Sequence, residues 1–428
     1  MRETMNIGVA GLGTVGTSAI KLLEENSELI AARCGKHLHV KAVCARTRGK
    51  PRGISLEGFD WVEDATLLAS RPDIDLFVEL IGGHDNTAKA AVEAAINAGK
   101  HVVTANKALL AIHGNAIAKM AEDAGVTLRF EAAVAGGIPV VKSLTESLAG
   151  ERIRRVLGVM NGTCNFILTR MESNGSSYEE TFAEADKLGY LESDPDLDVG
   201  GIDAGHKLAL LSSIAFGTQV DFAGMDIEGI KRISITDIEL ARDMGYRVKL
   251  LGVARMSDSG LEQRTEPCLV PANSPLGRVE NATNIVLLEG ETTGPVYLMG
   301  AGAGGGPTAA AVIGDIIDIA RGRTISTFGQ PASTLKKVAS TRSSAELAWY
   351  IRLLLVDQPG VLARIAAAFG DANVSINRLR QYGHDENGAP VLIVTHHTQR
   401  EQLNHSLNAV RKTGLSLREP VAIRIEDG

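Results

Sequence analysis

The chain has 428 residues, of which 44% are hydrophobic and 22% are charged. This length exceeds the size at which one hydrophobic core usually stops growing, so we expect two or three domains. The net charge of -7 leaves no basic stripe for phosphate contacts, so nucleic acid is not an expected partner. We find no secretion signal and no apolar run of the roughly 20 residues needed to cross a bilayer, and therefore expect a cytoplasmic protein with no membrane partner. The four cysteines form no CxxC pair, which fits reduced thiols.

The first 135 residues alternate short β-branched segments with Ala-rich helical patterns. The predicted strands cover residues 6–10, 40–45, 76–80, 100–104 and 127–131. Such alternation predicts βαβ units and hence an α/β fold with a parallel sheet over residues 1–135. A glycine-rich turn and an apolar helix at residues 300–330 are expected to return to this domain.

A glycine-rich turn follows the first predicted strand and leads into a helical segment. The turn reads GLGTVG, and its residues are the expected cofactor contacts: Gly11, Leu12, Gly13, Thr14, Val15 and Gly16. The first glycine permits a tight turn, the second lets the backbone approach a pyrophosphate, and the third allows close packing of helix on sheet. The order of strand, motif and helix predicts a Rossmann-type dinucleotide site.

The second predicted strand ends in a basic segment, CARTR, that includes Arg46. A fold specific for NAD usually places an acid here to bind the ribose hydroxyls, whereas an arginine suits a 2′-phosphate. We therefore expect NADP, with Arg46 on its phosphate. NAD remains possible, because the segment is also consistent with an ordinary solvated loop.

Residues 136–300 mix longer helices with strands and predict an α+β substrate and dimerisation domain. Within it, Asn161 or Thr163 of the turn NGTCN is expected to cap a helix. A polar linker is expected at residues 331–348, and residues 349–428 form a separate module.

Two lysines stand in chemically favourable positions. Lys107 follows the strand at residues 100–104, so it lies at the carboxyl edge of the predicted parallel sheet, where such folds bind ligands. Asp203 precedes Lys207 by one helical turn, so the two share a helix face. Glu192, Asp198 and Asp203 form an acidic cluster suited to a substrate ammonium group. Each feature also has a plainer interpretation, as a surface lysine or a solvated acidic loop.

Five segments together resemble homoserine dehydrogenase over about residues 5–325. They read GLGTVG, VVTANKALL, EAAVAGGIP, NGTCNFIL and LGYLESDPDLDVGGIDAGHKLALL, in this order. The resemblance implies reversible NAD(P)H-dependent reduction of L-aspartate 4-semialdehyde to L-homoserine, in the branch that leads to threonine, methionine and isoleucine.

The resemblance also implies roles for individual residues. Lys207 matches the family's proton donor to the aldehyde oxygen, and Lys107 matches the lysine between cofactor and substrate. Asp203 is expected to act with them, and Glu192, Asp198 and Asp203 match the substrate-binding acids. The assignment is chemically sensible, because hydride arriving at the aldehyde carbon creates an alkoxide that a nearby ammonium stabilises and protonates.

Two further sites follow from the resemblance alone. Glu131 and the backbone carbonyls of Val134, Gly136 and Ile138 match a loop that binds sodium or another monovalent cation. Gly304 matches a position that contacts the cofactor. From their chemistry alone, these residues would be interpreted as a structural hinge and a tight interdomain connection.

The last module predicts the order βαββαβ of a ferredoxin-like fold. With Asp357 and Gly360 in its first turn, it resembles an ACT domain, which usually binds amino acids between paired copies. We expect an amino-acid effector such as threonine, bound through Asp357, Gly360, Asn373 and Asn377, and a homodimer or homotetramer. The alternative is an oligomerisation domain that has lost its ligand.

Two other functions remain open at this point. One is a different NAD(P) oxidoreductase of small amino-acid-like aldehydes, although the acidic cluster beside Lys207 argues against it. The other is a non-catalytic amino-acid sensor with a relic nucleotide fold, although Lys107 and Lys207 are both in place.

Overall fold

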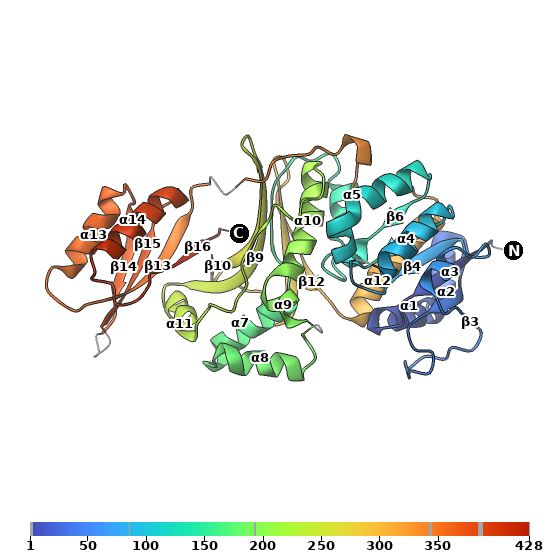
Figure 1. The fold of residues 1–428 in the computed structure, drawn as a ribbon, viewed down its shortest axis with the longest axis horizontal. Coiled ribbons are helices and arrows are strands. Elements are labelled where there is room, and N and C mark those ends of the chain that lie inside the picture. The colour runs from blue at the N-terminus through green and yellow to red at the C-terminus, as the bar shows by residue number, and fades with distance from the viewer. Residues whose placement is uncertain (1–2, 85, 192–193, 342–344, 384–387, 428) are drawn as a thin grey trace.

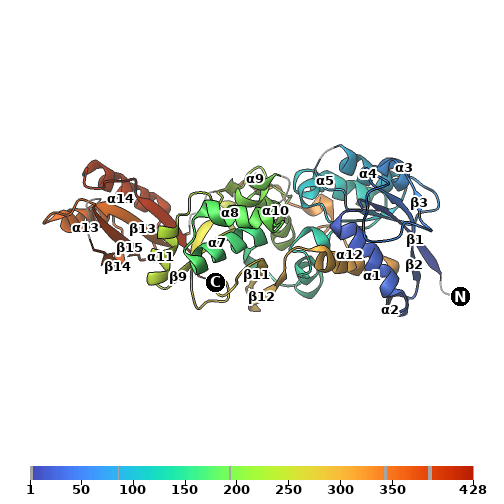
Figure 2. The same ribbon diagram turned by 90° about the horizontal axis from the view of Figure 1, so that it is seen from below.

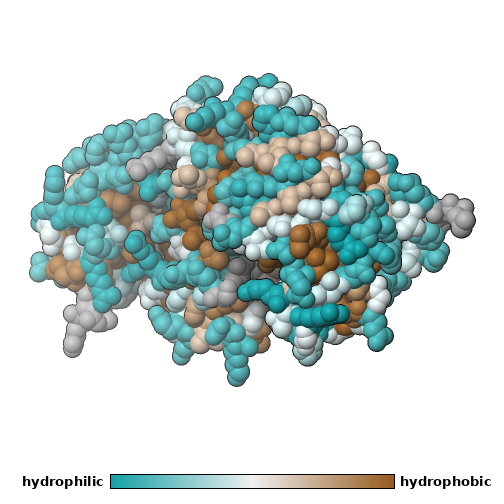
Figure 3. Space-filling view, turned by 45° about the vertical axis from the view of Figure 1, so that its right-hand side comes forward, coloured by the Kyte–Doolittle hydropathy of each residue, from teal (hydrophilic) through white to brown (hydrophobic). Residues whose placement is uncertain are grey.

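Three parts follow one another along the long axis of the molecule (Figures 1 and 2). The computed structural model describes residues 3–84, 86–191, 194–341, 345–383 and 388–427. Within these ranges, no helix combines the length and apolar character needed to span a bilayer. Hydrophilic residues predominate on the face seen in Figure 3, and hydrophobic residues form separate patches.

The N-terminal part contains a six-stranded, entirely parallel sheet of order β3-β2-β1-β4-β5-β6. Its strands are β1 (Thr4–Ala10), β2 (His37–Cys44), β3 (Asp60–Trp61), β4 (Leu76–Glu79), β5 (His101–Thr104) and β6 (Leu128–Arg129). The predicted Rossmann-type sheet is thereby confirmed. Because the strand order reverses between β1 and β4, a crevice opens at their carboxyl ends.

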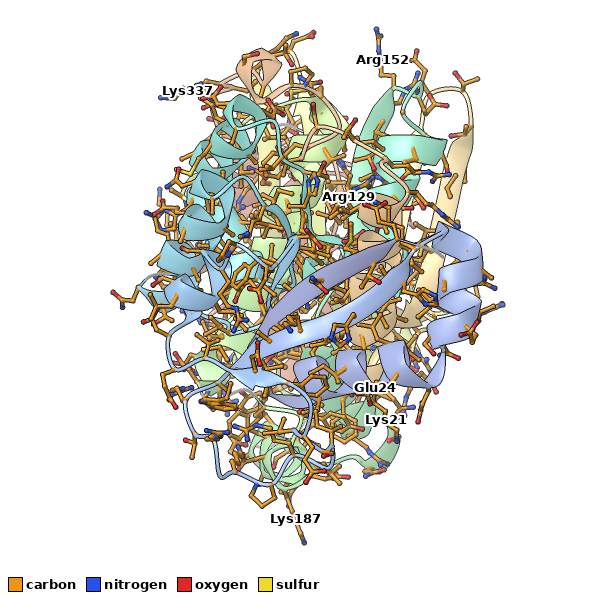
Figure 4. The ribbon with its side chains drawn as sticks, turned by 90° about the vertical axis from the view of Figure 1, so that its right-hand side faces the viewer. Lys21, Glu24, Arg129, Arg152, Lys187 and Lys337 are labelled. Carbon is orange, nitrogen blue, oxygen red and sulfur yellow. The ribbon has the colours of Figure 1, made fainter. Side chains whose placement is uncertain are left out.

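Helices cover both faces of this sheet. One layer contains α1 (Thr14–Glu25), α2 (Ser27–Cys34) and α12 (Gly305–Ala320), and the other contains α3 (Ala65–Ala69), α4 (Thr87–Asn97) and α5 (Lys107–Asp123). α12 returns from late in the chain and packs against α1. On α1, Ile20 and Leu23 are buried, whereas Lys21 and Glu24 lie at the surface (Figure 4).

The middle part is built on antiparallel strands of order β12-β11-β7-β9-β10. They are β7 (Ile153–Val159), β9 (Tyr246–Ser257), β10 (Gly260–Pro271), β11 (Thr283–Gly290) and β12 (Gly294–Ala301), and the short β8 (Asp226–Ile227) pairs with β10. The helical segments are η1 (Glu131–Ala133), α6 (Val140–Lys142), η2 (Ser143–Ser147), α7 (Gly162–Asn174), α8 (Tyr178–Lys187), α9 (Pro195–Val199), α10 (Ile202–Phe216) and α11 (Ile235–Asp243). α10 packs against β7, β9 and β10 as well as against α5 of the first part, so it connects the first part with the middle sheet.

The C-terminal module has the predicted βαββαβ order. Its elements are β13 (Ala348–Leu355), α13 (Val361–Asp371), β14 (Ile376–Gln381), β15 (Ala389–Thr395), α14 (Arg400–Lys412) and β16 (Val421–Ile425). α13 and α14 pack on one face of the sheet. α11 contributes to the cluster that covers the other face, where Arg352 donates to Asp237 across 2.6 Å.

The C-terminal sheet continues the middle sheet, which the sequence did not predict. β16 pairs with β10 in parallel, through Cys268 with Arg424 and Leu269 with Ile425, so ten strands form one sheet. The segment predicted as a linker packs along the middle part. It contains η3 (Ala332–Thr334), and Lys336 and Ser340 each form a single β-bridge with a residue of the middle part.

Candidate active site

The crevice beside β1 is a cleft of about 650 Å³ lined by Gly11, Leu12, Gly13 and Arg46, among others. Gly11 has φ +102°, and a Cβ there would collide with the carbonyl of Leu80. A Cβ at Gly16 would collide with the carbonyl of Gly11, whereas space is open around Gly13. The first and third glycines thus allow the tight turn and close packing, and the second leaves room for a ligand at the start of α1.

Three basic side chains and two acidic ones, Glu63 and Asp64, line this cleft. Arg46, Lys50 and Arg52 line it together with Thr47. The Arg52 guanidinium donates to the carbonyl of Lys50 across 2.8 Å and to those of Thr47 and Arg48, and it lies over the ring of Trp61. Arg52 therefore orders the loop that carries Arg46. Sequence reasoning missed Lys50 and Arg52, because nothing local to the strand end indicates that the loop folds back.

Asp203 lies between two lysines from different helices. The Nζ of Lys207 is 2.7 Å from Asp203 Oδ2, and the Nζ of Lys107 is 3.0 Å from Oδ1. Lys107 is the first residue of α5, whereas Asp203 and Lys207 lie on α10. The side chain of Asp203 is 4% exposed, and that of Lys107 is 27% exposed. The cluster is therefore buried at the α10 side and open to solvent at Lys107.

Asn161 organises the acids of this cluster. Its Nδ2 donates to Asp198 Oδ1 and to Asp203 Oδ2, both at 2.9 Å, and its Oδ1 accepts from the backbone N–H of Cys164 and caps α7. The predicted cap is confirmed, with Asn161 as the capping residue. The bridge from Asn161 to the two acids was not predicted, because its partners lie more than thirty residues away along the chain.

The electrostatics of the cluster favour an ionised carboxylate. Burial would raise the pKa of Asp203, but the charges of Lys207 and Lys107 and the hydrogen bonds from Lys207 and Asn161 outweigh it. The pKa of Asp203 consequently lies well below its ordinary value. Lys207 also donates to the carbonyl of Met160 across 2.9 Å, so the positions of its Nζ and of the carboxylate are both defined.

Glu131 lies in a separate buried loop. Its two carboxylate oxygens accept from the backbone N–H groups of Val141 and Lys142, at 2.9 and 2.8 Å. Burial and the charge of Asp315 raise its pKa to about 7, against the hydrogen bonds and the charge of Lys142. No group of three or more His, Cys, Asp or Glu side chains disposed to hold a metal occurs among the described residues. Any cation here would need backbone oxygens as ligands.

The C-terminal module has its own cleft of about 510 Å³ at the turn before α13. Asp357 and Gly360 line it, together with Gln381 of β14. Gly360 has φ +85° and is the N-cap of α13. Asn373 lies just beyond the other end of that helix. Because α13 has 11 residues and rises 1.5 Å per residue, its two ends are about 16 Å apart. Within one chain, the cleft therefore gathers two of the four predicted effector contacts.

Comparison with known proteins places the chain in a family. Models for the homoserine dehydrogenase NAD-binding domain, for homoserine dehydrogenase and for the ACT domain match residues 11–131, 139–317 and 349–414. A homoserine dehydrogenase from Neisseria gonorrhoeae is 41% identical over 432 residues, with 99% of each chain covered. The chain belongs to the homoserine dehydrogenase family.

Solved structures of homoserine dehydrogenases agree with this assignment. The crystal structure of the enzyme from Thiobacillus denitrificans matches with a TM-score of 0.93 at 37% identity, covering 100% of both chains. A hyperthermophilic archaeal homoserine dehydrogenase in complex with NADPH matches with a TM-score of 0.63 at 27% identity, covering 74% of this chain and 97% of that one. The chain is therefore an oxidoreductase of this family with a C-terminal ACT domain, and the two alternative functions are set aside.

For a homoserine dehydrogenase, the structure gathers some predicted site residues and separates others. Lys107, Asp198, Asp203 and Lys207 lie around Asn161, whereas Glu192 lies outside the described residues. Thr14, Val15 and Gly16 begin α1 at the cleft edge. Gly304 is the N-cap of α12, and a Cβ on the neighbouring Gly305 would touch Thr14 and Ser18, which places the α12 N-terminus beside the start of α1. Val134, Gly136 and Ile138 follow Glu131 in one buried turn.

Proposed function

We propose that Lys207 is the proton donor when L-aspartate 4-semialdehyde is reduced to L-homoserine. The observation that carries this proposal is the ion-pair cluster in which Asp203 contacts both Lys207 and Lys107. A bound nicotinamide supplies the hydride. As negative charge develops on the aldehyde oxygen, an ammonium held at a defined position stabilises it and then transfers its proton.

Lys107 and Asp203 complete this arrangement in our proposal. Lys107 lies at the carboxyl edge of the parallel sheet and is partly exposed, which suits a residue between cofactor and substrate. Asp203 holds both ammonium groups, and its low pKa keeps it ionised. Asp198, buried beside it, and Glu192 would bind the substrate ammonium together with Asp203.

The direct test is the initial rate of NADPH oxidation with aspartate semialdehyde. Lys207→Ala should abolish most of the rate while leaving the affinity for NADPH unchanged. Lys119→Ala is the matched control, because Lys119 also pairs with an aspartate one helical turn away, at the surface of α5. A Lys207→Ala enzyme that folds and retains wild-type kcat would refute the proposed donor.

The cofactor of our proposal is NADP, bound through the GLGTVG turn, Arg46 and Gly304. Three basic side chains support it, since Arg46, Lys50 and Arg52 line the cleft and the segment directly after β2 carries an arginine in place of an acid, although Glu63 and Asp64 also line the cleft. The archaeal relative in complex with NADPH also supports it. The ratio of kcat/KM for NADPH to that for NADH tests this preference.

We also propose a monovalent cation, such as sodium, at Glu131 and the carbonyl oxygens of Val134, Gly136 and Ile138. The residues fit such an ion, because the turn is buried and carries hard oxygen donors, and because a cation would favour ionisation of a carboxyl group whose pKa is raised to about 7. Thermal stability measured in sodium against a bulky organic cation tests the site: occupancy predicts a higher Tm in sodium.

The ACT domain is proposed to bind an amino-acid effector such as threonine. Asp357 and Gly360 line one cleft, and Asn373 and Asn377 would complete the site from a second copy, as expected for a homodimer or homotetramer. Calorimetric titration with threonine, together with the mass in solution, tests both statements.

The four unpaired cysteines support a cytoplasmic location.

A further inference from the structure

Glu79 is a buried carboxylate for which the proposed reaction has no role. It is the last residue of β4 and is 0% exposed. Its Oε1 accepts from the backbone N–H groups of Ile81 and Gly82, at 2.7 and 3.2 Å. Its Oε2 accepts from the hydroxyl of Thr104 across 2.6 Å. Burying an ionisable group costs free energy unless hydrogen bonds compensate for the lost water, so a buried carboxyl with several hydrogen bonds calls for an explanation.

The hydrogen bonds continue from Thr104 to the first turn of α5. The Thr104 hydroxyl oxygen accepts from the backbone N–H of Asn106 across 3.0 Å. The Asn106 amide donates to the carbonyl of Gly83 across 2.6 Å, and its Oδ1 accepts from the N–H of Leu109. Lys107 is the first residue of that helix. Glu79 therefore connects the loop after β4 with the segment that begins at Lys107.

Both connected segments border the proposed site. Leu80 and Ile81, which follow Glu79, line the cofactor cleft, and Lys107 pairs with Asp203. The strand ends concerned belong to neighbouring parallel strands, since Glu79 is paired with Thr104 in the register of β4 and β5. A change at Glu79 would therefore be transmitted to the cofactor wall on one side and to Lys107 on the other.

The carboxyl group of Glu79 accepts hydrogen bonds at both of its oxygens. The Thr104 hydroxyl donates to Glu79, and its oxygen accepts from the N–H of Asn106, so this hydroxyl joins the two residues. The other partners are N–H groups, which can only donate. Burial raises the pKa of Glu79 above its ordinary value, and the hydrogen bonds from Thr104, Ile81, Gly82 and Asn106 offset only part of that rise. An amide in the same place would satisfy the loop N–H groups but would present an N–H to Thr104.

We propose that Glu79 is a positioning residue that sets Lys107 against Asp203 through Thr104 and Asn106. It touches neither substrate nor cofactor. The inference rests on the proposed role of Lys107, so it deepens that role rather than adding a second activity. It predicts that the link to Thr104, and not the charge of Glu79 by itself, is what the reaction depends on.

The test uses Glu79→Gln, Thr104→Val and Thr104→Ser in the full-length enzyme. Glu79→Gln and Thr104→Val should each lower kcat about 10- to 100-fold and displace the pH profile of kcat, while the Kd for NADPH changes less than about threefold because the loop bonds to Ile81 and Gly82 persist. Thr104→Ser keeps the hydroxyl and should retain most of the activity. The double variant should lose no more than either single variant, because both break one link.

Controls separate this inference from the proposed function. Glu93→Gln removes a carboxylate from the Lys89–Glu93 pair on α4 and should leave kcat unchanged. If Glu79→Gln lowers only Tm and leaves kcat and its pH profile at wild-type values, or if the two single losses multiply, the inference is wrong. Lys107→Ala is measured in parallel. If Lys107→Ala retains full activity, the proposed role of Lys107 is wrong. If Lys107→Ala loses activity and Glu79→Gln does not, only the Glu79 inference is wrong.

Discussion

Two buried carboxylates of this enzyme are surrounded by cations, but the cations differ. Asp203 lies between Lys107 and Lys207, whereas Glu426, at 0% exposure, contacts Arg155, Arg255 and Arg264. A lysine ammonium can lose its proton, but an arginine keeps its charge at any pH the fold survives. The first cluster can therefore take part in proton transfer, and the second can only hold parts together.

The location of each cluster agrees with its chemistry. The lysine cluster joins α5 of the Rossmann part to α10 of the middle part, beside the cofactor edge. The arginine cluster joins β7, β9 and β10 to the residue that follows β16, where the two sheets become one. Arg264 is 3% exposed and donates to Glu266 as well as to Glu426. The ACT domain is thus attached through arginine side chains, whose charge does not change near pH 7.

The largest expected effect comes from removing the cation that can release a proton. Lys207→Ala should lower kcat about 1000-fold, because general acid catalysis typically contributes 10²- to 10⁴-fold. Lys207→Arg retains the charge but should restore little activity, since guanidinium is a poor acid. Steady-state rates at saturating NADPH measure both. Substantial rescue by arginine would mean that charge alone suffices, and the contrast between the two clusters would fail.

The matching change in the arginine cluster should alter stability rather than rate. Glu426→Gln leaves three arginines facing an uncharged group, and breaking a buried pair in this way costs about 3 kcal/mol. Urea unfolding should show that loss, while kcat of the folded enzyme stays within about twofold of wild type. Glu419→Gln, at a surface pair with Arg411, is the control and should change little. If Glu426→Gln instead lowered kcat strongly and left stability unchanged, the arginine cluster would take part in the reaction, and the comparison would be wrong.

Acid should also destabilise the fold near the lysine cluster, because a neighbouring histidine, His206, is buried. His206 precedes Lys207 on α10 and follows Asp203 by three residues; it is buried, and burial lowers its pKa to about 4, against the attraction of Asp203. Because the unfolded state binds this proton near pH 6.5, stability falls as the pH drops from there toward 4, by about 2 kcal/mol at pH 4.5.

His206→Gln has no such proton to bind and should lose less stability than wild type between pH 7 and pH 4.5. Denaturant unfolding of both proteins at the two pH values measures the difference. Equal losses would show that His206 titrates normally in the fold. The arginine cluster offers no comparable change, because none of its cations titrates in this range.

An exposed cation provides the smallest effect and a reference for both clusters. Arg46 lies in solvent at the cleft rim, where a charged contact to a 2′-phosphate contributes about 1 to 2 kcal/mol. Arg46→Ala should therefore raise the KM for NADPH about tenfold and leave the KM for NADH nearly unchanged. Equal changes for both cofactors would indicate that Arg46 shapes the loop without contacting the phosphate.

Local patterns predicted much of this protein because they depend on neighbours in the chain. The turn GLGTVG between a strand and a helix indicated the dinucleotide fold, the spacing of Asp203 and Lys207 indicated a shared helix face, and the order βαββαβ indicated the ACT domain. In each case the geometry of a single helix, strand or turn determines the relation between the residues.

Only the tertiary structure decided which distant groups meet. Lys107 reaches Asp203 because α5 packs against α10, Asn161 joins the two acids from a third element, and Glu79 faces Thr104 because β4 and β5 pair in that register. The joining of β16 to β10 is of the same kind. These contacts connect residues far apart in the chain, and no local periodicity encodes the packing of one element on another.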